Sequence, residues 1–288
     1  MLVDSRMTTD LRVVADGFHF LEGPRWRDGR LWVSDMHGER VVTVTSDGVV
    51  EPIVEVPTQP SGLGWLPDGR LLVVSMTDRR LLRLEAGRLV VHAELSGLAT
   101  FHCNDMVVDP AGRAYVGNFG YDYEAGQAFT SAVLALVHPD GRVEPAADDL
   151  AFPNGTVITP DGGTLIVAET FAHRLTAFTI APGGRLAGRR TWASLDEQVY
   201  PDGICLDAEG AIWVASPLTN EAIRVREGGA VTDRVAADRH VIACMLGGVD
   251  RRTLFVLAAT AIPRAEARAQ RGARILATTV DVPGAGSP

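Results

Sequence analysis

NDMVVDPAGRAYVGN, residues 104–118, is one of six versions of a phrase that decides the fold of this 288-residue chain. A polar residue opens the phrase, a mostly apolar run follows, and a turn leads into a β-rich run. The six versions are EGPRWRDGRLWVSD (Glu22 to Asp35), SGLGWLPDGRLLVVS (Ser61 to Ser75), NDMVVDPAGRAYVGN (Asn104 to Asn118), NGTVITPDGGTLIVAE (Asn154 to Glu169), DGICLDAEGAIWVAS (Asp202 to Ser216) and CMLGGVDRRTLFVLA (Cys244 to Ala258). Their turns contain Asp-Gly, Glu-Gly and Ala-Gly pairs, which accept the backbone angles of tight turns. Each version therefore predicts a β-hairpin.

The spacing of the six hairpins predicts how the chain is organised. When they are aligned on a shared valine, from Val33 to Val256, successive steps are 40, 43, 51, 47 and 42 residues. Repeats of about 40–50 residues, each long enough for about four strands, are typical of a β-propeller. We therefore predict an all-β fold, a six-bladed β-propeller, in a single domain over residues 1–288. Residues 1–10 and 283–288 are expected to be disordered.

Both ends of the chain carry strand patterns that the six phrases leave over. These are LRVVA, from Leu11 to Ala15, and RILATTVDV, from Arg274 to Val282. Closed propellers commonly complete one blade with strands from both termini, which removes exposed sheet edges. We expect these two segments to pair.

The residue that opens each phrase matters for function, because equivalent positions in the blades of a propeller form a ring around its axis. The six are Glu22, Ser61, Asn104, Asn154, Asp202 and Cys244. Four of them offer carboxylate or amide oxygen, which is costly to bury without partners. Converging groups of this kind usually share water, hydrogen bonds or a cation. The ring is therefore the candidate site.

Aspartates also occur in the hairpin turns, at Asp28, Asp68 and Asp161. Aspartate is favoured in turns because its side chain accepts hydrogen bonds from backbone amides. The turns lie at the opposite end of the inner strand from the ring, so we expect these aspartates to be structural.

Composition excludes several classes of function. A formal net charge of −9 argues against nucleic-acid binding, which needs a basic face. No segment resembles a signal peptide or a membrane span. The cysteines, Cys103, Cys205 and Cys244, are odd in number and lack a C-x-x-C pair, so neither a disulfide framework nor a structural zinc site is indicated. We expect a cytoplasmic protein without nucleic-acid or membrane partners, a monomer or small homo-oligomer.

Four of the phrases resemble, in order, motifs of the gluconolactonase and regucalcin (senescence marker protein) family. They are LEGPRW around Glu22, HCNDMVVDPAGRAYVGN around Asn104, FPNGTVITPDGGTLIVAET around Asn154 and YPDGICLDAEGAIWVA around Asp202. The resemblance extends over nearly the whole chain. It implies a metal-dependent hydrolase that opens a sugar-acid lactone or another small lactone by metal-activated water.

The resemblance also implies a role for each of these residues. Glu22, Asn154 and Asp202 would be the protein ligands of one divalent metal ion, and Asp202 would also accept a proton from the attacking water. Asn104 resembles the position that reaches the substrate or a metal-bound water. Two carboxylates and one amide leave coordination positions open for catalysis. Calcium is the expected ion, with zinc, magnesium, manganese or iron(II) as alternatives.

The chain departs from the family two residues before the Asn-Asp pair, where sugar-lactone members often carry arginine and this chain has His102. A neutral imidazole makes fewer hydrogen bonds than a guanidinium, which argues against a polyhydroxylated aldonolactone. His102 is either a substrate-binding residue or a structural histidine. From the long loop Asn118 to Ser131, we expect Tyr121 and Asp122 to contact substrate.

Other functions stay open at this stage. An organophosphate or ester hydrolase of the same fold would use the same metal with a more apolar pocket. A strictosidine synthase-like propeller would be metal-independent, and the Glu, Asn and Asp set argues against it. A non-enzymatic calcium-binding regulator or scaffold is a further alternative, but a scaffold would not need acidic and amide residues at matching inward positions.

Overall fold

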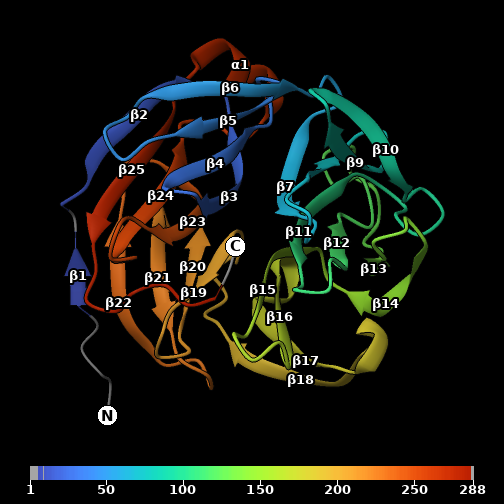
Figure 1. Cartoon of the computed structure of the whole chain (residues 1–288). Coiled ribbons are helices and arrows are strands. Elements are labelled where there is room, and N and C mark those ends of the chain that lie inside the picture. The colour runs from blue at the N-terminus through green and yellow to red at the C-terminus, as the bar shows by residue number, and fades with distance from the viewer. Residues whose placement is uncertain (1–5, 9, 287–288) are drawn as a thin grey trace.

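Each of the six predicted hairpins forms two neighbouring strands of a separate sheet. The computed structural model describes residues 6–8 and 10–286, and its sheets surround one axis as the blades of a six-bladed β-propeller (Figure 1). The predicted fold class is confirmed. Within each blade the two strands of the predicted hairpin are the innermost pair, and the remaining strands lie progressively further from the axis.

The blades follow one another along the chain. Blade 1 contains β3 (Leu21–Arg27), β4 (Arg30–Asp35), β5 (Arg40–Val44) and β6 (Val50–Glu55), and blade 2 contains β7 (Pro60–Trp65), β8 (Leu71–Ser75), β9 (Arg80–Glu85) and β10 (Arg88–Glu94). Blade 3 contains β11 (Cys103–Val108), β12 (Ala114–Asn118), β13 (Ala132–Val137) and β14 (Val143–Leu150), and blade 4 contains β15 (Pro153–Ile158), β16 (Thr164–Glu169), β17 (Arg174–Ile180) and β18 (Leu186–Ser194). Blade 5 contains β19 (Ile204–Leu206), β20 (Ile212–Ser216), β21 (Glu221–Val225) and β22 (Val231–Ala236), and blade 6 contains β23 (His240–Gly247), β24 (Thr253–Ala259), β25 (Ala273–Thr279) and β2 (Arg12–Phe18).

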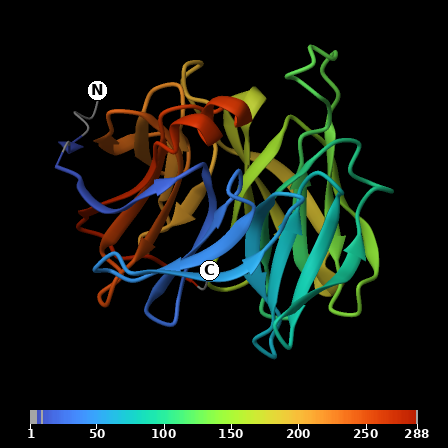
Figure 2. The same cartoon turned by 90° about the horizontal axis from the view of Figure 1, so that it is seen from above.

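Among the described residues, helical structure is confined to short connections. They are the 3₁₀ turns η1 (Thr170–Ala172) and η2 (Pro182–Gly184) and the helix α1 (Arg264–Gln270). Within the described part of the chain, no helix has the length and apolar character needed to span a bilayer. Figure 2 shows α1 and the long loop between β12 and β13 on the same face of the propeller.

Both termini complete blade 6, as predicted. Strand β2 pairs antiparallel with β25, with Arg12 opposite Ala277 and Val13 opposite Leu276. The outer edge of the last blade is therefore supplied by the N-terminal part of the chain, which ties the first segment to the last.

The chain ends differ from the expected disorder. Strand β1 (Arg6–Thr8) pairs parallel to β22, and residues 283–286 cross the axis at the face opposite α1. Gly284 forms a β-bridge with Asp207, and Arg251 Nη1 donates to Gly286 O at 2.8 Å. These backbone groups find partners on blades 5 and 6, so the expectation was wrong for residues 6–8 and 283–286. Residues 1–5, 9, 287 and 288 lie outside the described residues.

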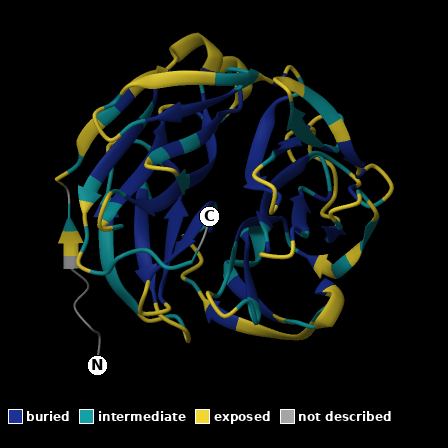
Figure 3. Cartoon of the chain, viewed as in Figure 1, coloured by how far each residue is buried: buried dark blue, intermediate teal, exposed yellow. Residues whose placement is uncertain are grey.

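Close approach of the inner strands brings the ring together. Figure 3 shows these strands almost wholly buried, with exposed residues on the outer strands and loops. A Cβ atom on Gly23 would lie 2.5 Å from Ser61 O, and one on Gly155 would lie 2.5 Å from Asp202 O. Such distances are too short for a real side chain, so glycine directly after the ring residue lets neighbouring blades touch.

The structure corrects the ring position of blade 6. In blades 2 to 5 the ring residue lies two positions before the residue paired with the aligned valine, as Asn104 lies before Met106, the partner of Val116. In blade 6 the partner of Val256 is Cys244, because one more strand pair separates the valine from the turn than in blade 3. The ring residue is therefore Ile242.

Cys244 lies one layer deeper, in the core. Its Sγ is 3.9 Å from Cys205 Sγ, and the two residues do not form a disulfide. Cys103 is also buried and free.

Two of the three turn aspartates accept hydrogen bonds from backbone amides as expected, whereas the contact that Asp28 makes within the described residues is with the Arg27 side chain. Asp68 Oδ1 accepts from Arg70 N at 3.1 Å, and Asp161 Oδ1 accepts from Gly163 N at 3.0 Å. Neither residue lines the cavity described below.

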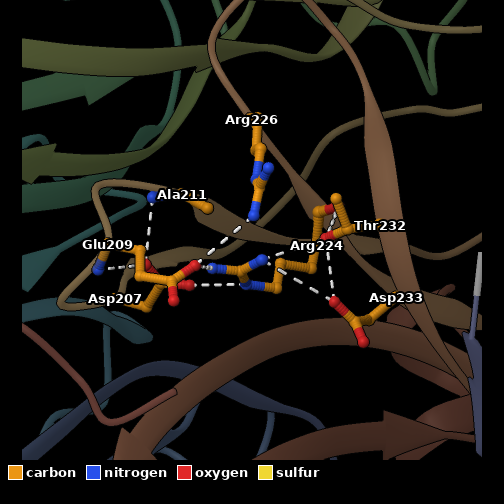
Figure 4. A network of polar contacts seen from close by, with 7 residues as sticks. All are labelled: Asp207, Glu209, Ala211, Arg224, Arg226, Thr232 and Asp233. Carbon is orange, nitrogen blue, oxygen red and sulfur yellow. Dashed lines mark hydrogen bonds and ion pairs between the residues drawn. The ribbon is translucent and has the colours of Figure 1, made fainter. Parts of the chain in front are cut away.

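Blade 5 has a more extensive version of this arrangement (Figure 4). Asp207 Oδ1 accepts from Glu209 N and Ala211 N, and its Oδ2 accepts from Arg224 Nε at 2.6 Å. Arg224 also contacts Glu209, Thr232 and Asp233. A buried guanidinium needs such a complete set of acceptors, so we regard the cluster as structural.

Deleting residues 1–15 should destabilise the whole propeller, because it removes half of β2 and reopens the edge of blade 6. We expect the midpoint of thermal unfolding to fall by about 5–10 °C, corresponding to a few kcal/mol for a chain of this size. Deleting residues 1–10, which leaves β2 whole, is the matched control. Equal melting of the full chain and the longer deletion would show that closure contributes nothing.

Candidate active site

The four polar ring residues meet in one cavity. Glu22, Asn104 and Asn154 lie at the starts of β3, β11 and β15, and Asp202 lies two residues before β19. All four line a cavity of about 490 Å³. The structure therefore brings together, from blades 1, 3, 4 and 5, the residues that the sequence analysis predicted as a site.

Hydrogen bonds fix the orientation of the Asn154 amide. Its Nδ2 donates to Thr170 Oγ1 at 3.3 Å, and Thr170 Oγ1 in turn donates to Pro201 O at 2.8 Å. The hydroxyl can therefore only accept from Asn154, which leaves Asn154 Oδ1 as the free end of the amide. That oxygen is buried and has no hydrogen-bond partner. Thr170 was not predicted from the sequence, although it is the last residue of the matched motif around Asn154.

The two carboxylates of the site are close enough to repel each other. Burial raises the pKa of Glu22 well above its ordinary value, and the charges of Asp202 and Asp105 raise it further. Burial likewise raises the pKa of Asp202 to about 8, with a contribution from Asp105 and an offsetting contact with the Asn154 amide. Asp202 Oδ1 is buried without a hydrogen-bond partner. At Glu22, the Gly23 amide and the charge of Arg25 lower the pKa and partly offset these effects.

This donor set fits a hard divalent cation. An unpaired amide oxygen, an unpaired carboxylate oxygen and a second carboxylate are ligands that calcium, magnesium and manganese accept. Among the described residues, no group of three or more His, Cys, Asp or Glu side chains is arranged to hold a metal. The fit therefore depends on the amide of Asn154 as the third ligand.

Asn104 offers the cavity a hydrogen-bond donor, in contrast to the acceptor oxygens of Asn154 and Asp202. Its Oδ1 accepts from Ser61 Oγ at 3.5 Å, whereas its Nδ2 is buried without an acceptor. Asn104 therefore offers an unused donor to the cavity, which suits a substrate oxygen rather than a cation.

A buried ion pair lies beneath the ring and was not predicted. Arg25 Nη2 contacts Asp105 Oδ1 at 2.8 Å, and both side chains are almost completely buried. The pair joins blade 1 to blade 3, and Arg25 also lines a small cavity of about 30 Å³ with Ala285 near the chain end. The charge of Arg25 lowers the pKa of Glu22, opposing the effect of burial.

The residues predicted to contact substrate are placed unequally. His102 and Asp122 line the cavity, and the His102 ring stacks on Phe101 with centroids 4.0 Å apart. Tyr121 does not line it and instead packs against Phe129, with centroids 5.5 Å apart. The next tyrosine along the loop, Tyr123, lines the cavity in its place.

Aromatic residues form one side of the cavity, which the sequence analysis missed. We call them the aromatic wall: Phe101, Phe119, Tyr123, Phe152, Phe171 and Tyr200. The sequence holds a signal, because an aromatic residue stands two positions before the ring residue in three blades, at Phe20, Phe152 and Tyr200. Residues before an inner strand and after its partner meet at the same end of the blade, so such positions line the cavity.

Known proteins were compared with the chain. The family described as "SMP-30/Gluconolactonase/LRE-like region" matches residues 20–260. Regucalcin from Danio rerio is 28% identical over 266 residues, covering 87% of this chain and 86% of that protein. The pentonolactonase XacC from Haloferax volcanii is 28% identical over 265 residues, covering 87% of this chain and 85% of that protein.

A solved structure shows the same fold. The structure of regucalcin from Agrobacterium tumefaciens, described as a calcium-binding protein, superimposes with a TM-score of 0.82 at 22% identity. The match covers 99% of this chain and 98% of that one. The family match extends from just before Glu22 to the end of β24 and includes every polar ring residue. The chain therefore belongs to the SMP-30/gluconolactonase/LRE-like family.

Proposed function

We propose that the protein is a hydrolase that opens a lactone in the cavity with the help of one divalent cation, calcium being the first expectation. Glu22, Asn154 and Asp202 would hold the cation. The family supports lactone hydrolysis, because its description includes gluconolactonase and a similar protein is a pentonolactonase.

The unpaired oxygens of Asn154 and Asp202 carry this proposal. They belong to neighbouring blades, which are joined where Gly155 N donates to Asp202 O at 3.1 Å. A buried acceptor without a partner costs about 1–3 kcal/mol, and a cation held by both oxygens removes that cost. The adjacent carboxylate of Glu22 strengthens the argument, since a cation also relieves the repulsion between the two acids.

The chain's own residues can carry out the remaining steps. A bound divalent cation would supply Lewis acidity at the lactone carbonyl. Asn104 Nδ2, oriented by Ser61, can donate to the carbonyl oxygen as negative charge develops there. The Asp202 carboxylate can accept a proton from the attacking water and return it to the ring oxygen that leaves, which yields the hydroxy acid.

A calcium-binding protein without catalytic activity is the second candidate, since the Agrobacterium tumefaciens structure is described as calcium-binding. Two observations favour the enzyme. The cavity of about 490 Å³ has the size of a small-molecule site and far exceeds the volume of an ion. The unpaired donor of Asn104 cannot bind a cation but can bind a substrate oxygen.

Substitution of the proposed base should separate catalysis from ion binding. Asp202→Asn should lower kcat on a lactone by about 10²–10⁴-fold, because the amide cannot accept the proton. Glu22→Gln should instead raise the calcium concentration needed for half-maximal activity, and chelation of the wild type should abolish activity reversibly. A pH-drop assay over a panel of lactones and esters measures these effects.

Asp68→Asn, in an exposed turn, is the control and should keep the parental rate. Parental kcat in Asp202→Asn, or full activity of the chelated wild type, would contradict the mechanism. Hydrolysis of esters or organophosphates but not lactones would move the assignment to that class.

Without the cation, Asp202 should make the folded protein less stable as pH rises. Its folded pKa of about 8 exceeds the ordinary value of 3.8, so between these values the folded protein holds a proton that the unfolded chain has lost. Stability conferred by that proton declines as pH rises through this window. In chelator, Asp202→Asn should therefore melt higher than the wild type at pH 8, by on the order of 5 °C, and the difference should shrink at pH 5.5.

The exposed turn substitution Asp161→Asn serves as the control. The pKa of Asp161 is lowered, chiefly by its hydrogen bond with Thr159, so its effect should be constant between pH 5.5 and pH 8. A melting difference for Asp202→Asn that does not change with pH would refute the raised pKa.

A further inference from the structure

The aromatic wall is continuous. Ring centroids are 6.3 Å apart between Phe101 and Phe119, 4.4 Å between Phe119 and Phe152, 5.0 Å between Phe152 and Phe171, and 6.4 Å between Phe171 and Tyr200. Tyr123 packs on both Phe152 and Phe171. The wall lies at the ends of blades 3, 4 and 5 where the inner strands begin, beside the ring residues Asn104, Asn154 and Asp202.

Other apolar residues also line the cavity. They are Phe20, Met36, Met76, Pro217, Leu218 and Ile262, alongside the polar residues His37, Gln59, Thr77 and Arg264. Leu218 is 58% exposed, and Phe119, Phe171 and Tyr200 are only half-buried, so this apolar surface is open to a ligand. Apolar groups gathered around a concave site, with few polar groups at its floor, mark the binding of an apolar ligand.

The charged groups that line the cavity exclude anions. Glu22 and Asp202 are balanced by the proposed cation, whereas Asp122 and Glu124 are additional negative charges near the mouth. Arg264 is the basic residue of the described lining, and its Nη2 already contacts Glu39 Oε1 at 2.6 Å. A carboxylated or phosphorylated substrate would meet net repulsion here.

Polyhydroxylated substrates also fit this surface poorly. Each hydroxyl of a sugar lactone needs a hydrogen-bond partner, because a polar group that leaves water without one costs affinity. The wall offers mainly ring faces: its Tyr123 hydroxyl contacts Glu124 Oε1 at 3.5 Å, and the Tyr200 hydroxyl is its other polar group. The unused donor of Asn104 serves the reacting carbonyl, so it is not available to hydroxyls further out.

We propose that the substrate is a neutral lactone with an apolar alkyl or aryl substituent that lies against the aromatic wall, while its carbonyl group points to Asn104 and the ring. This inference rests on the proposed lactone hydrolysis and adds the substrate class. The substituent fills the part of the cavity beside the aromatic wall, and the short polar end of the lactone reaches the ring residues at the floor.

A ladder of substrates tests the inference with the full chain in calcium buffer. We expect kcat/KM to rise about fourfold for each methylene buried between γ-butyrolactone, γ-hexalactone and γ-octalactone. D-glucono-1,5-lactone should be a poorer substrate than γ-octalactone. A flat ladder, or a preference for the gluconolactone, would overturn the apolar class and leave lactone hydrolysis standing.

Substitutions test whether the preference for longer lactones arises at the aromatic wall. Phe171→Ala, on the half-buried turn η1, should lose about tenfold or more in kcat/KM on γ-octalactone but less than about threefold on γ-butyrolactone. Phe129→Ala is the matched control, because Phe129 is 57% exposed and does not line the cavity. Equal losses on both lactones, or the same profile in both variants, would count against the wall as the binding surface.

Binding measured without turnover separates this inference from the proposed function. Calorimetric titration with the lactam analogues of the same ladder should show affinity rising with chain length. That result together with no hydrolysis of any lactone would refute the proposed function but support the apolar site. Absence of both hydrolysis and binding would overturn both proposals.

Discussion

The close contact between neighbouring inner strands is the constraint on which the site depends. In blades 1, 2, 4 and 5, glycine after the ring residue lets the backbone of one blade touch the next, as Gly155 touches the carbonyl of Asp202. A side chain there would push the blades apart and widen the ring. The same contact places acidic and amide groups from blades 1, 3, 4 and 5 around one small volume. Bringing these groups together for the proposed reaction therefore also brings the buried acids close enough to repel each other.

The repulsion between the acids is offset by a positive charge on one side of the ring but not by any partner on the other side. Beneath the ring, Arg25 pairs with Asp105 and opposes the charge of the acids, and residues 283–286 cross the axis below it. Above the ring, Asn154 Oδ1 and Asp202 Oδ1 have no partner in the protein. These two oxygens at the floor of the cavity are therefore available to a cation, which would face the aromatic wall. Low polarity around the cation would strengthen its electrostatic effect on a bound carbonyl.

Much of this organisation could be predicted from the sequence, because the hairpin phrase repeats and its first residue has a fixed place in each blade. Prediction of Cys244 as a ring residue failed because Val256 lies one residue further from its turn than the aligned valine of blade 3, which only strand pairing reveals. The Arg25–Asp105 pair joins residues 80 positions apart, and nothing local in the sequence indicates such a contact. Within the long loop, spacing could not decide whether Tyr121 or Tyr123 turns toward the cavity, because loops lack a fixed period.

Anomalous diffraction from crystals soaked in a divalent ion would test the central claim most directly. Calcium, or manganese as a stronger scatterer, should give one peak at the floor of the cavity, about 2.0–2.6 Å from oxygens of Glu22, Asn154 and Asp202. The peak should disappear in Asn154→Ala crystals soaked in the same way, while the propeller stays intact. A peak bound by other residues, or none at the ring at saturating ion concentration, would contradict the account.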